Sequence, residues 1–87
     1  MMIWDPDKAK ELLKSRNIIL AEIAGIILDE RYTAILSHPK KPSQRIFVVS
    51  YKGYMHAVPF VIDAEENIII KTAYPSRKRE KRFRRPT

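Results

Sequence analysis

The chain has 87 residues, 45% hydrophobic and 31% charged, which is typical of one globular domain and excludes a disordered chain. It contains no cysteine, so disulfides and cysteine-based zinc sites are excluded. Seventeen basic and ten acidic side chains leave a net charge of +7, which favours a polyanionic partner such as nucleic acid.

The N-terminal third predicts a strand stub followed by two helices. Asp5 and Pro6 suit the N-cap and first position of a helix that ends at Asn17 in the left-handed conformation. A second helix is predicted over 20–30, although its β-branched isoleucines leave a strand as the alternative. Gly25 either weakens this helix by about 1 kcal/mol or allows close packing against a sheet.

From residue 31 onward, hydrophobic residues alternate with a period of two, which predicts a sheet. Lys52-Gly53 indicates a hairpin turn, and Pro59 indicates an edge position or a bulge. Three consecutive isoleucines near the end predict a central strand that is buried on both faces. The predicted strands cover 32–36, 45–52, 54–62 and 68–74.

The excess positive charge lies in the basic C-terminal segment 76–87, where Ser76 suits the N-cap of a short helix over 77–83. Between Arg77 and Arg85 there are seven basic residues and one acid, so the remainder of the chain has a net charge of only +1. The alternative is a solvated basic tail. We therefore expect one α+β domain over 1–87: two N-terminal helices packed on a four-stranded, mainly antiparallel sheet, with a short basic C-terminal helix.

The sequence offers no pattern for a metal or a small-molecule cofactor. His38 and His56 are the only histidines and lack metal-ligand spacing, and two glycines cannot form a phosphate-binding loop. The longest apolar stretch, residues 18–28, is too short to span a bilayer. We expect a cytoplasmic protein without metal, cofactor or membrane segment.

The remaining basic, aromatic and imidazole side chains suit metal-independent RNA cleavage, in which a ribose 2′-OH attacks the adjacent phosphate. We expect His56 or Tyr74 to transfer a proton, while Arg45 and Arg77 stabilise the phosphorane. A structural role for His56 and a packing role for Tyr74 remain the alternatives. The expected RNA-binding residues are Lys71, Lys78, Arg79, Lys81, Arg82, Arg84 and Arg85.

Three segments, taken in this order, resemble BrnT-type toxins of the RelE-like ribonuclease toxin superfamily. Trp4-Asp5-Pro6-Asp7-Lys8-Ala9-Lys10 with Asn17 resembles their opening helix, and Arg45-Ile46-Phe47-Val48-Val49 is similar to one of their strands. Ile68 to Ala73 followed by Arg77 to Lys81 is similar to their closing strand and basic segment.

The resemblance implies an endoribonuclease toxin of a type II toxin–antitoxin pair, which cleaves mRNA, free or on the ribosome, and inhibits translation. It also implies a cognate antitoxin that blocks the basic site, and a phosphate-handling role for Arg45, Arg77, Lys78, Arg79 and Lys81. The alternative is a non-catalytic nucleic-acid- or protein-binding module, including a gyrase-directed RelE-like toxin, because a fold alone does not determine activity.

Overall fold

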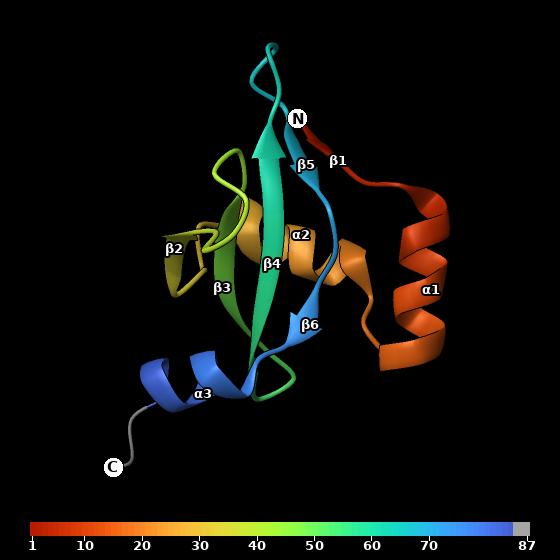
Figure 1. The fold of residues 1–87 in the computed structure, drawn as a ribbon. Coiled ribbons are helices and arrows are strands. Elements are labelled where there is room, and N and C mark those ends of the chain that lie inside the picture. The colour runs from red at the N-terminus through yellow and green to blue at the C-terminus, as the bar shows by residue number, and fades with distance from the viewer. Residues whose placement is uncertain (85–87) are drawn as a thin grey trace.

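The computed structural model describes residues 1–84, which form three helices and six strands (Figure 1). The α+β class is confirmed, but the expected four-stranded sheet is wrong. One mixed sheet contains all six strands, and β1 pairs with β5 in parallel. The elements are β1 Met2–Ile3, α1 Pro6–Arg16, α2 Leu20–Leu28, β2 Ala34–Ser37, β3 Arg45–Tyr51, β4 Tyr54–Ile62, β5 Ile68–Ile70, β6 Tyr74–Pro75 and α3 Arg77–Phe83.

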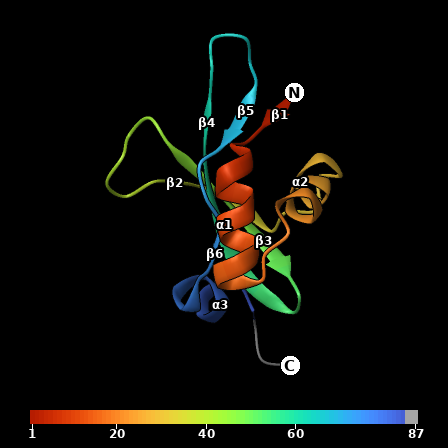
Figure 2. The same cartoon turned by 90° about the vertical axis from the view of Figure 1, so that its right-hand side faces the viewer.

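The sheet has the order β1-β5-β4-β3-β2, and β6 pairs with β4 beyond the end of β5. Figure 2 shows α2 and α3 on opposite sides of this sheet, with α1 beside β5 and β6. The main core lies under α1 and α2, where Phe47 and Phe60 stack with ring centroids 4.1 Å apart. We call this the helix-covered face, and the side on which α3 lies the α3 face.

Residues next to each end of α1 determine where this helix begins and where it ends. The Asp5 carboxylate accepts the Asp7 N–H at 2.8 Å, and Pro6 occupies the first turn, where its missing N–H costs nothing. Asn17 ends the helix with φ 55°, a left-handed conformation that asparagine tolerates. The expected cap, first residue and stop of this helix are therefore confirmed.

Helix α2 depends on a partner from the sheet. Its N-cap residue, Ile19, has no side-chain oxygen. The Tyr51 hydroxyl accepts the Ile19 N–H at 3.1 Å and donates to the Glu22 carboxylate at 2.7 Å, so it joins the two ends of a capping box. The helix alternative is confirmed over the strand, although α2 ends at Leu28, two residues before the expected boundary.

Gly25 in α2 is not needed for close packing, since a Cβ atom built at this position meets nothing within 4 Å. The expectation that Gly25 allows close packing against the sheet is therefore wrong. Gly25→Ala is therefore expected to increase the free energy of unfolding by about 1 kcal/mol, because alanine loses less backbone entropy in a helix. Thermal unfolding should show a midpoint about 4–8 °C higher. An unchanged or lower midpoint would mean that the open space beside Gly25 is occupied.

The expected closing strand over 68–74 is wrong as a single element, because a bulge divides it into β5 and β6. Two residues of β4 lie between the partners of Ile70 and Tyr74, whereas three residues separate Ile70 from Tyr74. Pro59 lies opposite this bulge, and its carbonyl accepts the Lys71 N–H at 2.9 Å. Because proline has no N–H to donate on that side, the ladder is interrupted there. The expected bulge at Pro59 is thus confirmed.

The three isoleucines of β5 lie one strand from the edge, between β4 and β1, instead of at the centre of the sheet. Only Ile70 is fully buried, and Ile68 and Ile69 are half-buried. Within residues 1–84, no helix is long and apolar enough to cross a membrane.

Candidate nucleic-acid interface

The basic helix α3 is fixed to the sheet through the backbone of one residue. Ser76 caps the helix by accepting the Arg79 N–H at 3.2 Å, as expected. The Met55 carbonyl accepts the Ser76 N–H at 3.0 Å, and the Met55 N–H donates to the Glu80 carboxylate at 2.8 Å. The Glu80 carboxylate thereby takes the place of a carbonyl from a neighbouring strand at the start of β4. The hydrogen bonding that begins between β6 and β4 thus continues into α3.

The second oxygen of Glu80 is also occupied. It accepts a hydrogen bond from Arg84 Nε at 3.0 Å, and Arg84 in turn donates to the Ser50 hydroxyl at 3.1 Å. The bond from Arg84, followed by that from the Met55 N–H, lowers the pKa of the Glu80 carboxyl. The single acid of α3 is therefore committed to docking the helix.

Glu80→Ala is expected to release α3 from β4, because the Met55 N–H loses its acceptor. Exchange of the Met55 amide with deuterated solvent should become faster, whereas the neighbouring exposed variant Lys81→Ala should leave it unchanged. Because the pKa of Glu80 is lowered in the folded chain, this docking is complete above about pH 4.3 and is lost as the pH falls further. Equal Met55 exchange in both variants would contradict this role for Glu80.

Basic side chains from three elements gather at the end of the molecule that contains α3. We call them the cationic end: Arg16, Lys52, Arg77, Lys78, Lys81 and Arg82, all of which are exposed. Figures 1 and 2 both place α3, the β3–β4 hairpin and the last turn of α1 at this end, opposite the N-terminus and the β4–β5 turn. None of the six forms an ion pair with a residue in the range 1–84. No acid within residues 1–84 neutralises these charges, although Lys52 Nζ donates to the Asn17 carbonyl at 2.8 Å.

An open hollow of about 500 Å³ lies between the end of α1 and β6 and is lined by Ser15, Arg16, Tyr74 and Pro75. The Arg16 guanidinium lies 5.9 Å from the centre of the Tyr74 ring, and it donates to the Ala73 carbonyl at 3.3 Å. An aromatic ring and a guanidinium in one hollow provide stacking and phosphate binding, the two interactions that single-stranded RNA requires.

Arg79, expected among the RNA-binding residues, differs from its neighbours on α3. It is only 8% exposed, and its Nε is buried without a hydrogen-bond partner among the residues that the structure describes. Lys71 is exposed in the bulge between β5 and β6, and Arg84 is exposed and paired with Glu80. Arg85 lies outside the described residues.

His56 lies on the helix-covered face and is only 7% exposed. Its ring packs edge-on against Tyr51, with centroids 5.3 Å apart, and its Nδ1–H donates to the Tyr54 carbonyl at 2.9 Å. Burial is the main cause that lowers the pKa of His56 below its ordinary value; the bond to Tyr54 opposes the shift, and nearby Lys52 adds to it. These surroundings are those of a neutral, packed histidine.

The buried position of His56 predicts that the stability of the fold depends on pH. Since the folded pKa of His56 is lowered, the unfolded chain binds more protons, and the free energy of unfolding should fall as the pH decreases below about 6.5. His56→Gln should flatten the dependence between about pH 7 and pH 5.5. His38→Gln, in the β2–β3 loop, serves as the control. Identical pH profiles for parent and His56→Gln chains would contradict the prediction.

The four residues expected to act in catalysis do not converge on one site. Arg45 begins β3 opposite Phe60, whereas His56 is opposite Val49. Arg45 is therefore four positions from the level of His56, about 13 Å along the strand. Tyr74 pairs with Ala57, so its side chain leaves the sheet on the other side from His56. Tyr74, the first residue of β6, and Arg77, the first residue of α3, are three positions apart in the chain.

Sequence reasoning missed Arg16 and Lys52 as members of this surface and Glu80 as its anchor. The one available signal was the position of Glu80 as a single acid within a basic run. No group of three or more potential metal-ligating side chains occurs among residues 1–84. Comparison of the chain with protein-family models, with curated proteins and with solved structures found no match.

Proposed function

We propose that this protein is a metal-independent ribonuclease toxin that binds RNA at its cationic end and inhibits translation. The main support is the set of six exposed basic side chains around α3, whose single acid is already bound to Met55 and Arg84. Clustered cations without neutralising acids favour a phosphate backbone. The resemblance to BrnT-type toxins agrees with this proposal.

In the proposed reaction, the 2′-oxygen of a ribose bonds to the adjacent phosphorus and the bond to the 5′-oxygen breaks, leaving a 2′,3′-cyclic phosphate. The 2′-OH loses its proton, and the departing 5′-oxygen gains one. Arg16 and Arg77 neutralise the phosphorane, and the hydroxyl of Tyr74, whose ring lies beside Arg16, handles a proton or orients the 2′-OH. His56 is not assigned to this step because it lies on the helix-covered face.

A cognate antitoxin is proposed to cover the cationic end with acidic side chains, since an exposed cationic site needs a complementary block. This assignment places the antitoxin on α3 and beside Tyr74, where it would exclude RNA directly.

The test is cleavage of a defined RNA by the purified protein in EDTA, with and without ribosomes. The products should carry 2′,3′-cyclic phosphate ends, and a single 2′-deoxy substitution at the cleaved nucleotide should prevent cleavage there. A cleavage that resists this substitution would contradict the mechanism. No cleavage under either condition would contradict the ribonuclease proposal.

A second candidate, a non-catalytic nucleic-acid- or protein-binding module, is favoured by one observation. His56 is buried on the helix-covered face, and His38 lies in the β2–β3 loop, so neither of the chain's two histidines is exposed at this surface. This candidate predicts salt-dependent binding of RNA that remains intact after prolonged incubation.

A further inference from the structure

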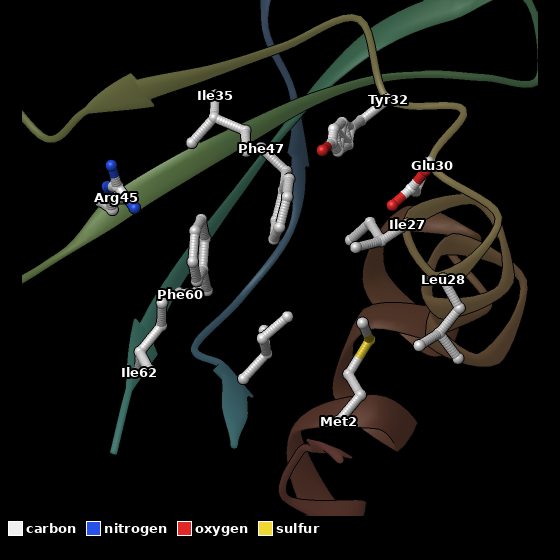
Figure 3. A pocket seen from close by; sticks show the side chains of 11 residues that line it. Met2, Ile27, Leu28, Glu30, Tyr32, Ile35, Arg45, Phe47, Phe60 and Ile62 are labelled. Atoms are coloured by element: carbon white, nitrogen blue, oxygen red, sulfur yellow. The ribbon is translucent and has the colours of Figure 1, made fainter. Parts of the chain in front are cut away.

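A second surface, far from the cationic end, has the opposite character. A groove of about 310 Å³ opens between the end of α2 and the start of β3. Figure 3 shows Phe47 and Phe60 side by side in it, with Ile27 and Met2 on the α2 side. The groove is thus largely apolar, and the core stacking of Phe47 on Phe60 extends to its surface.

Three large apolar side chains that line this groove are exposed. Leu28 is 66% exposed, Ile62 is 51% exposed and Ile35 is 41% exposed. They come from three different elements, α2, β4 and β2, and all three line the groove. Apolar side chains that gather on one surface mark an interaction site, because leaving them in water is unfavourable.

The charged residues of the groove have opposite signs and lie on opposite sides. Figure 3 shows Arg45 at one side and Glu30 at the other, with Phe47 between them. Both are exposed, and neither forms an ion pair within residues 1–84. A uniformly acidic partner would be repelled by Glu30, and a uniformly basic partner would be repelled by Arg45. The partner must therefore present both signs in the reverse order.

A second copy of this chain, turned by a twofold axis, meets that condition. In a twofold interface, residue i contacts residue j and j contacts i, so Arg45 of each subunit would face Glu30 of the other. The same symmetry brings the projecting Leu28 of each subunit to the apolar groove of the other. We propose that this groove is the interface of a homodimer, held by reciprocal insertion of Leu28 and by two Arg45–Glu30 pairs.

The positions of the two surfaces agree with this proposal. The groove includes Arg45, the first residue of β3, and Ile62, the last residue of β4. Helix α3 is bound at Ser50 and Met55, at the other ends of the same two strands. A dimer through the groove therefore leaves both cationic ends exposed and apart, although each subunit has a net charge of +7.

The test is sedimentation equilibrium of the full chain from about 1 μM to about 1 mM, the range in which weak dimers dissociate. A concentration-dependent monomer–dimer equilibrium is expected. Arg45→Glu and Glu30→Arg should each weaken association at least about tenfold, since each places like charges together twice in the dimer. The double variant Arg45→Glu/Glu30→Arg should restore it.

Matched controls are Lys10→Glu and Glu65→Arg, which change the net charge equally at exposed positions outside the groove. They should leave the dimer unchanged. Leu28→Ser should weaken association while leaving the monomer's melting temperature nearly unaltered, because Leu28 is mostly exposed. A chain that remains monomeric over the whole range, or charge reversals that do not rescue each other, would overturn the proposal.

Discussion

Replacing Arg77, Lys78 and Lys81 together with alanine is expected to weaken RNA binding about fifty-fold at about 0.15 M salt. All three side chains are exposed on α3 and unpaired with any described acid. Each phosphate contact releases about 0.7 of a counterion from single-stranded RNA, so three contacts account for about two units of the log–log salt slope.

The measurement is the RNA dissociation constant as a function of salt concentration for the folded variant. The control is Lys10→Ala/Lys40→Ala/Lys41→Ala, which removes three exposed charges from α1 and from the loop after β2. This control should keep the parent slope, because its charges lie outside the cationic end. If both variants changed the slope equally, binding would depend on net charge alone, and the assignment of the site to α3 would be wrong.

The elements that the sequence predicted well depend on chemistry within a few residues. Asp5 and Ser76 accept N–H groups of the turns that follow them, and Asn17 tolerates the left-handed stop. Lys52 and Gly53 both have positive φ, at 52° and 77°, as a two-residue hairpin turn requires. Such signals need no information from distant strands, which is why these boundaries agree with the structure.

The features that the sequence did not predict depend on contacts between distant residues. The cap of α2 is the hydroxyl of Tyr51, which is separated from Ile19 by 32 positions. The parallel pairing of β1 with β5 joins segments that are 66 positions apart, since Met2 lies opposite Ile68. Nothing in the local pattern of either segment specifies its partner.

The bulge opposite Pro59 explains why the predicted site did not assemble. If the pairing of Ile70 with Phe60 continued without an extra residue, Tyr74 would lie opposite His56, and both side chains would share one face. The extra residue instead pairs Tyr74 with Ala57 and sends the two side chains to opposite faces. The alternation of faces expected along 45–52 and 54–62 agrees with the structure, but the pattern within one strand does not specify the register between strands.

This separation leads to a prediction about the chemical step, under the proposed ribonuclease function. Tyr74→Phe is expected to lower the single-turnover rate of RNA cleavage by about 10² to 10⁴, the usual contribution of a group that moves a proton in the transition state. RNA affinity should change little, because the phenyl ring still stacks on a base beside Arg16. His56→Gln should cut RNA at close to the parent rate, since His56 packs against Tyr51 under the helices.

Tyr54→Phe is the matched control, because it removes the same hydroxyl from a residue that lies opposite Tyr51 on the helix-covered face. Each variant is checked by thermal unfolding before its rate is compared. Loss of cleavage in Tyr74→Phe alone would support a proton-handling or orienting role for that hydroxyl at the cationic end. Loss in a folded His56→Gln chain would instead place the reaction on the helix-covered face. Parent rates in both would leave the arginines to act alone, by orienting the 2′-OH and neutralising the phosphate.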